Sequence, residues 1–347
     1  MADIQSQFVQ FHEAIKLNNF EENVVLREKR DLILDKLRTN LGKDFGDKGQ
    51  KPPTFTTRNQ GSYAMGTGVK PLYGDYDIDV AVIFNIDKSV YPDPTKVKQW
   101  VVDALRGHNV EMKRPCVTVQ YQRKGEPIYH LDLPIYSAGD QNADGKTYLA
   151  KGFPGSASEN KRWEPSDFVA LCEKINNRFE GSDREQFRRV IRCLKRWKDH
   201  RFPSSGNAAP VGIGVTIAAY NWFEPKVQSL FSGKPDDLGA LLHLVRRILE
   251  RFQTTWTGDE FGSRLKLSMP VEPWDNPFDR MSHKQMNNLE SRLKELRDGL
   301  ADAQRRVDPV EAAKLMREHF GDDFPVPEPK DTGSRGGSSI VSSGRSA

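Results

Sequence analysis

QGSYAMGTGVKPLYGDYDIDVAVIF, the stretch from Gln60 to Phe84, places a Gly-Ser pair ahead of two aspartates and an apolar run. Asp77 and Asp79 stand at the start of that run, whose β-branched and aromatic residues predict a strand. Alternate side chains of a strand share one face, so both carboxylates point the same way. Like charges held that close repel each other unless a cation lies between them, and a hard divalent ion such as Mg²⁺ prefers oxygen ligands. The stretch therefore predicts a strand that binds a metal ion.

A second apolar run, HLDLPIY in residues 130–136, contains a third carboxylate, that of Asp132. Because the leucines on either side of it would face the core of a sheet, Asp132 would face the opposite side. If this strand lies beside the first one, Asp132 joins Asp77 and Asp79 in a site for two Mg²⁺ ions, with Mn²⁺ as the other candidate ion. In such a site one ion activates a hydroxyl and the other stabilises the leaving pyrophosphate. Asp77, Asp79 and Asp132 are therefore the predicted catalytic residues and metal ligands.

The register of the metal-binding pair has an alternative, because Asp75 lies on the same strand face as Asp77. We favour Asp77 and Asp79, since the apolar run follows Asp79 at once and sets the ion at the mouth of the strand. Taken alone, an Asp-x-Asp pattern usually marks a solvated strand end, and Asp132 could be a buried structural residue. The combination of these features, in this order and at strand starts, favours function. Three histidines that stand singly receive no ligand role: His108, His130 and His200.

The Gly61-Ser62 pair predicts a contact with phosphate groups. A Gly-Ser turn that enters a helix offers unpaired backbone N–H groups and a hydroxyl to a triphosphate. On its own such a pair is a very weak signal. Ahead of the aspartates, at a distance that leaves room for a short helix or loop before the strand, it predicts that this segment binds the nucleotide on which the metal ions act.

A basic stretch, residues 184–201, is predicted to be a helix with an excess of positive charge. The plain interpretation is that this helix is solvated. The functional interpretation places one or two of its cations against a triphosphate, and Lys195 is favoured because neighbouring apolar residues would anchor the helix beside it. The basic residues of the stretch are Arg184, Arg188, Arg189, Arg192, Lys195, Arg196, Lys198 and Arg201.

Composition divides the chain into four segments: N-terminal helices in 1–53, a catalytic sheet core in 54–165, a helical lobe in 166–325, and a tail in 326–347. The tail is rich in Gly, Ser and Pro and is predicted to be disordered, because it has too few apolar residues to offset chain entropy. The expected helices are 4–41 with a break at 17–19, 94–107, 166–180, 184–200, 210–222, 235–253, 282–305 and 309–319. The expected strands are 80–84, 116–121 and 129–136. Residues 139–158 are expected to be irregular, and Ser166 and Asp183 are expected to cap helices.

The overall composition favours a cytoplasmic protein without a membrane segment. No apolar run reaches the length of about 18 residues that a membrane span needs, and the first ten residues, MADIQSQFVQ, carry no secretory signal. The net charge of +4 is too small to indicate a nucleic-acid partner by itself. The cysteines lack the spacing of metal ligands, which argues against a zinc site or a disulfide scaffold: Cys116, Cys172 and Cys193.

These motifs resemble the bacterial CD-NTase family, the cGAS- and DncV-like cyclic oligonucleotide synthases of anti-phage (CBASS) systems, within the polymerase β-like superfamily. The resemblance covers about residues 1–325 and is strongest from 60 to 136. Segments 163–167, 187–197 and 320–325 also resemble the family, whereas 210–214 lacks the serines that relatives often have there, and Phe168 replaces an expected proline. The family motif Gly-Ser…Asp-x-Asp…Asp is matched by Gly61, Ser62, Asp77, Asp79 and Asp132.

The resemblance implies a mixed α/β (α+β) fold, in which a polymerase β-like nucleotidyltransferase sheet lobe and a C-terminal helical (OAS-like) lobe enclose an active-site cleft. It implies that ATP and GTP, or other NTPs, are joined into a cyclic di- or trinucleotide, with cyclic GMP-AMP as the best candidate. That product would be a second messenger acting through a downstream effector in anti-phage defence. A ubiquitin-transfer-like or other regulatory partner would act on the tail, and a double-stranded DNA activator is not expected, because no zinc-binding insert is present. The implied nucleotide-binding residues are Gln60, Gly61, Ser62 and Lys195.

Two alternatives of other classes stay open. The chain could be a template-independent RNA nucleotidyltransferase, such as a poly(A) or CCA-adding enzyme, although such an enzyme needs an extended RNA-binding surface. It could also be a non-catalytic interaction protein on a degenerate transferase scaffold, although the intact set of aspartates argues against that.

Overall fold

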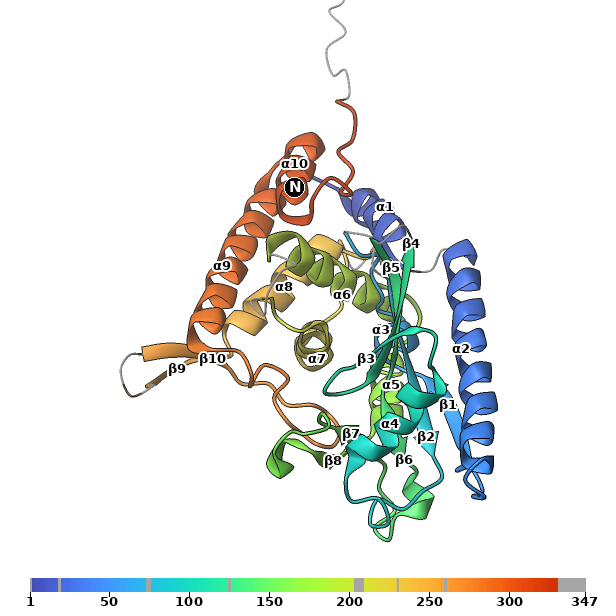
Figure 1. Ribbon diagram of the computed structural model, residues 1–347. Coiled ribbons are helices and arrows are strands. Elements are labelled where there is room, and N and C mark those ends of the chain that lie inside the picture. The colour runs from blue at the N-terminus through green and yellow to red at the C-terminus, as the bar shows by residue number, and fades with distance from the viewer. Residues whose placement is uncertain are drawn as a thin grey trace, which may run out of the picture.

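The structure is a computed structural model that describes residues 2–17, 20–72, 76–123, 126–202, 209–229, 231–256, 258 and 261–329 (Figure 1). The helices are α1 (Gln5–Ile15), α2 (Phe20–Gly46), α3 (Gly61–Ala64), α4 (Pro94–Ala104), α5 (Phe168–Asn176), α6 (Gly181–Arg201), α7 (Gly212–Trp222), α8 (Asp237–Leu249), α9 (His283–Arg305) and α10 (Pro309–Phe320), with short 3₁₀ turns η1 (Gly139–Gln141) and η2 (Ser158–Asn160). The strands are β1 (Phe55–Asn59), β2 (Tyr76–Phe84), β3 (Asn109–Met112), β4 (Val117–Arg123), β5 (Glu126–Leu133), β6 (Ile135–Ser137), β7 (Tyr148–Lys151), β8 (Arg162–Pro165), β9 (Phe252–Trp256) and β10 (Phe261–Leu265).

An eight-stranded mixed sheet forms the first lobe and is organised around β2. Along the described strands the order is β3-β4-β5-β2-β6-β7-β8, with β1 paired antiparallel to β2. The first half of β2 pairs in parallel with β5, and its second half pairs in parallel with β6. The expected single strand 129–136 is therefore two strands, because Pro134, which has no N–H to donate, separates them.

The two faces of the sheet have different partners because side chains alternate along each strand. On one face, the apolar residues of β2 pack with α2 and α4 in one hydrophobic core (Figure 1). The opposite face carries Asp77 and Asp79 near the start of β2, and farther along the strand Ala81 packs with Tyr136 and Phe168. The polar end of this second face is therefore left open toward the other lobe.

The second lobe is a helical core in which α6 is central. Its apolar side chains are buried against α1, α7, α8, α9 and α10. Helix α1 belongs to this core, since Phe8 and Phe11 pack on Phe320 and Phe324, whereas α2 packs on the sheet. Of the N-terminal helices in 1–53, which were expected to brace the core, α2 packs on the sheet and α1 packs in the helical lobe. The expected mixed α/β, bilobed fold is confirmed (Figure 1).

Several local predictions were wrong. Residues 139–158, expected to be irregular, contain η1 and β7, and the helix expected over 235–253 ends at Leu249 because β9 follows. The N-cap of α5 is Asp167, which accepts from the N–H of Ala170, rather than Ser166. Helix α6 begins at Gly181, so Asp183 lies in its first turn and does not cap it. The tail predicted for 326–347 lies outside the described residues from 330 onward.

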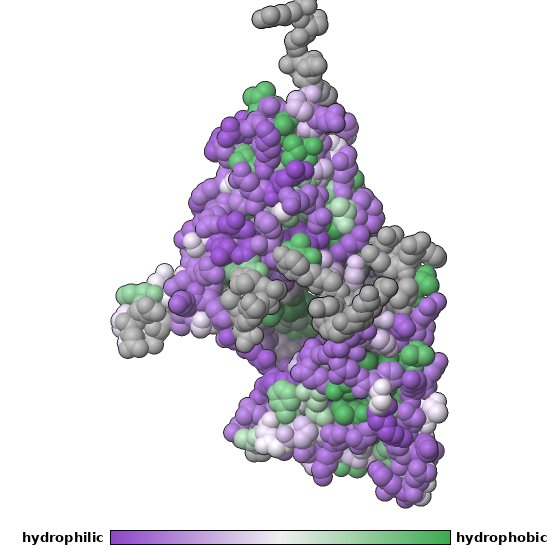
Figure 2. Space-filling view, turned by 45° about the horizontal axis from the view of Figure 1, so that its top comes forward, coloured by the Kyte–Doolittle hydropathy of each residue, from purple (hydrophilic) through white to green (hydrophobic). Residues whose placement is uncertain are grey.

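The face shown in Figure 2 is mostly hydrophilic and is hollowed between the two lobes. Among the described residues, no helix combines the length and the apolar character that crossing a bilayer requires.

Candidate functional site

A cavity of about 680 Å³ lies between the lobes and takes its walls from both. The sheet lobe contributes β2 and α3, and the helical lobe contributes α5, α6, the start of α7 and the loop 269–273. Of the residues predicted from the sequence, six line this cavity: Gln60, Gly61, Ser62, Asp77, Asp79 and Lys195. The predicted site residues therefore gather at one hollow, with Asp132 on the strand beside it.

The pairing of β2 with β5 sets the geometry of the acidic residues. The two strands are parallel, and their register places Asp77 opposite His130 and Asp79 opposite Asp132. Because residues two apart share a strand face, all four side chains lie on the same face of the sheet. The two strands are neighbours, as expected, and their pairing places His130 beside the three predicted aspartates.

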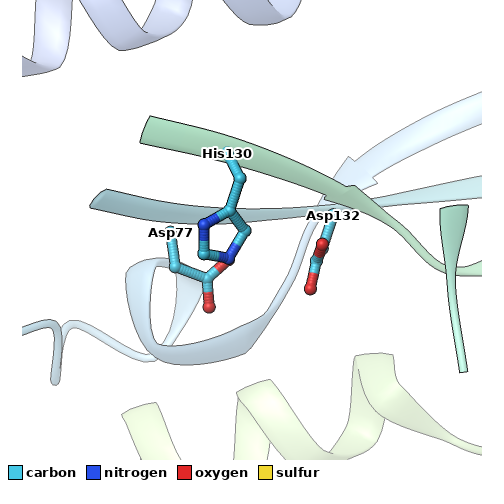
Figure 3. A group of neighbouring side chains, drawn as sticks. All are labelled: Asp77, His130 and Asp132. Atoms are coloured by element: carbon cyan, nitrogen blue, oxygen red, sulfur yellow. The ribbon is translucent and has the colours of Figure 1, made fainter. Parts of the chain in front are cut away.

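Three of these side chains form a compact group of metal-ligand type (Figure 3). One ligand atom from each of Asp77, His130 and Asp132 lies within 4.8 Å of the others. The imidazole Nε2 of His130 is 3.2 Å from Oδ1 of Asp77. Two carboxylates and an imidazole at this spacing are a donor set that fits a divalent cation. The prediction that His130 stands singly was wrong, because its ring lies beside Asp77 and Asp132.

Asp79 lies against the Gly61-Ser62 turn. Gly61 has a φ of +68°, and a Cβ atom at that position would collide with the carboxylate of Asp79. The N–H of Gln60 donates to the main-chain oxygen of Asp79 at 3.0 Å. Burial, followed by the charges of Asp77 and Asp132, raises the pKa of Asp79 to about 8. In the absence of a cation, Asp79 is therefore largely protonated at neutral pH.

Asp132 is held in place by residues that the sequence did not single out. Its Oδ1 accepts a hydrogen bond of 2.5 Å from the hydroxyl of Thr118, which lies opposite it on β4. The ammonium of Lys113 is 3.8 Å from the same oxygen. These contacts orient one oxygen of Asp132. The sequence alone does not indicate a role for Thr118, because that role depends on the pairing of β4 with β5.

The Gly-Ser segment forms a single helical turn, α3, as expected. Its preceding residue, Gln60, accepts a hydrogen bond of 3.0 Å from the hydroxyl of Tyr136 through Oε1. Tyr136 is buried and packs on Phe168, with ring centroids 4.6 Å apart. Gln60 is thus held by Tyr136, whose ring is itself packed on Phe168, while Ser62 lines the cavity.

Lys195 reaches the cavity from α6 and holds the chain that follows α3. Its ammonium donates to the main-chain oxygen and to the hydroxyl of Thr67, both at 3.1 Å. Arg192 donates to the main-chain oxygen of Gly68 at 2.9 Å. Burial, with the nearby charges of Lys198 and Arg192, lowers the pKa of Lys195 to about 7. A negatively charged ligand would restore the ammonium form.

The basic helix is therefore not a solvated face, and the plain interpretation of residues 184–201 was wrong for its inner side. Arg192, Lys195 and Arg196 are all buried. Arg189 forms a two-pronged ion pair with Asp237 at 2.6 and 3.0 Å, which joins α6 to α8. Arg189 thus ties α6 to α8, whereas Lys195 and Lys198 line the cavity.

The alternative register, Asp75 with Asp77, is not resolved, because Asp75 lies outside the described residues. One signal could have identified His130 from the sequence. It stands two residues before Asp132, so the alternation that places Asp132 on the open face of the sheet places His130 there as well.

A comparison with protein families matches a large part of the sheet lobe. Residues 53–136 match the family model for the nucleotidyltransferase domain of cyclic GMP-AMP synthase DncV-like proteins. No curated protein sequence matches the chain.

Solved structures with the same fold are numerous and distant in sequence. The chain is similar to the DncV cyclic AMP-GMP synthase of Vibrio cholerae, with a TM-score of 0.65 and 16% identity over 92% of this chain and 97% of that one. It is also similar to the CD-NTase CdnG of Bradyrhizobium diazoefficiens, solved with GTP, with a TM-score of 0.66 and 15% identity over 93% and 96%. A further DncV structure contains a linear intermediate, 5′ pppA(3′,5′)pG, with a TM-score of 0.63 and 16% identity over 92% and 96%. At these identities the likeness establishes the fold.

Proposed function

Because the chain belongs to the bacterial CD-NTase family through its DncV-like nucleotidyltransferase domain, we propose that it joins nucleoside triphosphates into a cyclic di- or trinucleotide. The best candidate is cyclic GMP-AMP made from ATP and GTP. The observation that carries the proposal is the parallel register of β2 and β5, which sets Asp77, Asp79 and Asp132 on one face at the edge of the cavity. The cavity volume of about 680 Å³ lies within the range of about 300–1,000 Å³ that is usual for small-ligand sites.

The proposed reaction is a nucleotidyl transfer that occurs twice. A ribose hydroxyl of one nucleotide attacks the α-phosphorus of another, and the bond from that phosphorus to the bridging oxygen breaks. Pyrophosphate leaves, and the hydroxyl proton passes to solvent. A second transfer within the linear product closes the ring and releases a second pyrophosphate. Little covalent chemistry falls to the side chains, so positioning and charge neutralisation dominate.

In this proposal, different residues bind the metal ions and the phosphate groups. Two Mg²⁺ ions, or Mn²⁺, held by Asp77, Asp79 and Asp132 would supply the charge that activates the hydroxyl and stabilises the leaving group. Gly61 and Ser62 offer main-chain N–H groups and a hydroxyl to the triphosphate.

Lys195 and Gln60 complete the phosphate contacts. The ammonium of Lys195, which is bonded to Thr67 without nucleotide, is within the same cavity and would turn to a phosphate oxygen. Gln60, held by Tyr136, fixes the start of α3.

The wider role is proposed from the family. The product would act in the cytoplasm as a second messenger in anti-phage defence, through a downstream effector. A ubiquitin-transfer-like or other regulatory partner would act on the C-terminal tail. Two of the similar structures, CdnG with GTP and DncV with a linear pppApG intermediate, contain nucleotides, which supports NTPs as substrates here.

The test is to incubate the purified chain with pairs of NTPs, one of them labelled at the α-phosphate, in Mg²⁺ or Mn²⁺. The products are treated with phosphatase and resolved by chromatography. We expect a product resistant to phosphatase that requires two NTPs or two equivalents of one. Extension of an added RNA primer would favour the RNA nucleotidyltransferase instead. Loss of all label to phosphatase, for every pair and both ions, would contradict the proposal.

A further inference from the structure

The group of side chains near the start of β2 contains His130, although a metal site made of three carboxylates needs no histidine. We propose that His130 is itself a metal ligand, and that one imidazole nitrogen with one oxygen each from Asp77 and Asp132 makes a mixed site that favours Mn²⁺ over Mg²⁺. The inference rests on the proposed function only for what the ion does. It concerns which atoms hold the ion and which ion they prefer.

The position of His130 is set by main-chain pairing on both sides of β5. It lies opposite Asp77 on β2 and opposite Gln120 on β4. Asp132, two residues on, lies opposite Asp79 and Thr118. Because β5 is bonded to a strand on each edge, its side chains have fixed origins. His130 and Asp132 therefore point to the same face without any rearrangement of the backbone.

The side chains of the group are close enough for one ion to bind all three. Their ligand atoms lie within 4.8 Å of one another, and Nε2 of His130 is 3.2 Å from Asp77 (Figure 3). The side chains of His130 and Asp132 are 19% and 17% exposed, whereas that of Asp77 is 50% exposed. The side chains of His130 and Asp132 are thus the more buried members of the group, and that of Asp77 lies on its solvent side.

Asp79 lies beside this group but is not one of its members. Its carboxylate faces Gly61, and it is not among the residues whose ligand atoms lie within 4.8 Å. Asp79 is therefore placed to serve an ion nearer the Gly61-Ser62 turn. The first ion then has two carboxylates and an imidazole as its protein ligands.

The donor set decides the preferred ion. Mg²⁺ takes oxygen ligands almost exclusively and keeps several waters. Nitrogen donors shift a site toward first-row transition ions, whose affinities exceed that of Mg²⁺ and rise from Mn²⁺ onward. Among those ions Mn²⁺ also accepts carboxylates readily. One imidazole beside two carboxylates therefore favours Mn²⁺.

The alternative role for His130 is a hydrogen bond that only orients Asp77. Glutamine separates the two roles, since its side chain reaches about as far as Nε2 and donates a hydrogen bond, but its amide nitrogen does not bind metal. His130→Gln is therefore the test variant. The matched control is His108→Gln, because Nε2 of His108 also has a polar partner, Lys36, at 3.0 Å, and lies away from the cavity.

The experiment uses the full chain, stripped of metal with EDTA and loaded with one equivalent of Mn²⁺. Electron spin echo envelope modulation reports a directly bound nitrogen as ¹⁴N modulation. It is recorded without nucleotide and with a non-hydrolysable ATP analogue. We expect ¹⁴N modulation in the wild type and in His108→Gln, and none in His130→Gln. The free Mn²⁺ signal in a titration should show affinity weakened by at least about tenfold in His130→Gln, with a smaller loss for Mg²⁺ measured by competition.

Two results would overturn the inference: no ¹⁴N modulation in the wild type in either state, or ¹⁴N modulation that persists in a folded His130→Gln protein. Either one would leave His130 as an orienting hydrogen-bond partner of Asp77. The readouts need no catalytic turnover. A nitrogen-ligated ion in a protein that makes no product would contradict the proposed function alone, and product formation without nitrogen coordination would contradict this inference alone.

Discussion

The carboxylate of Asp79 lies so close to Gly61 that a Cβ atom at that glycine would collide with it. This contact joins the strand that carries the predicted metal ligands to the turn that is proposed to bind the triphosphate. The main chain reinforces the junction, since the N–H of Gln60 donates to the oxygen of Asp79 at 3.0 Å. The glycine of the Gly-Ser pair is thus required by geometry, and the proposed phosphate and metal sites cannot move independently.

Substitution of Gly61 should uncouple the two sites. Gly61→Ala introduces a strained φ and pushes Asp79 out of place, so we expect nucleotide transfer to fall below detection. The strain of an L-residue at positive φ costs about 1–2 kcal/mol of folding stability. Product formation and thermal unfolding, measured on the same preparation, check this.

Gly66→Ala is the matched control for that experiment. Gly66 also has a positive φ, of +62°, but its added Cβ would meet the flexible side chain of Arg188 at 3.1 Å rather than Asp79. We expect a similar loss of stability and much greater residual activity. Equal losses of activity in the two variants would show that backbone strain, rather than the contact with Asp79, explains the effect.

The raised pKa of Asp79 predicts how the stability of the metal-free protein changes with pH. The pKa rises from its ordinary value of 3.8 to about 8 in the folded chain. Between these values the unfolded chain releases the proton while the folded chain keeps it, so the folded state loses stability as pH rises. Asp79→Asn removes this loss. In EDTA, its melting temperature should exceed that of the wild type by a margin that grows up to about pH 8 and is constant above it.

Calorimetry at several pH values from 5 to 9 measures this margin. Asp140→Asn, which changes an exposed carboxylate on η1, is the control and should show no such growth. A margin for Asp79→Asn that stays constant across the whole range would contradict the assignment of the raised pKa to Asp79.

Lys195 should matter for the triphosphate more than for the fold. Lys195→Met keeps the length and packing of the side chain but removes the charge, so we expect triphosphate affinity to fall by about ten- to a hundredfold, as for a lost charged hydrogen bond. Calorimetric titration with a non-hydrolysable NTP measures the change. Arg184→Ala, near the start of α6 and bonded to the main chain at Phe179, should have little effect. Equal losses of triphosphate affinity in both variants would contradict a direct contact between Lys195 and the triphosphate.

The Gly- and Ser-rich tail should be dispensable for catalysis and needed in cells. Deletion of residues 336–347 removes none of the predicted site residues, so purified activity should be unchanged. Protection against phage, in a strain carrying the full operon, should fall if a partner enzyme uses the tail as a handle. Unchanged protection would contradict this role for the tail.

The acidic core of the site could be predicted because it depends on alternation along single strands. Asp77 and Asp79 stand at the start of one apolar run and Asp132 interrupts another, and that pattern is local. What a local pattern does not give is the register between strands. His130 gained its significance from pairing opposite Asp77, a relationship between residues more than fifty positions apart, and Thr118 gained its own from the pairing of β4 with β5.

The remaining errors also come from tertiary contacts. The basic residues of α6 look solvated in the sequence, yet Arg192 and Lys195 are buried because main-chain oxygens at Gly68 and Thr67 accept from them. The short strand β7 has only four residues, too few for a clear local signal, and exists because β6 and β8 pair with its edges. In both cases a distant segment satisfies polar groups that local sequence leaves unsatisfied.

The measurement that tests the central claim most directly is NTP conversion by Asp77→Asn/Asp79→Asn beside the wild type and Asp75→Asn. Each product mixture is treated with phosphatase and the resistant label is counted, with melting temperatures recorded to confirm folding. The account predicts resistant cyclic product from the wild type and from Asp75→Asn, and none from a folded double variant. Full product formation by the double variant would contradict the claim that these two carboxylates of β2 hold the catalytic ions.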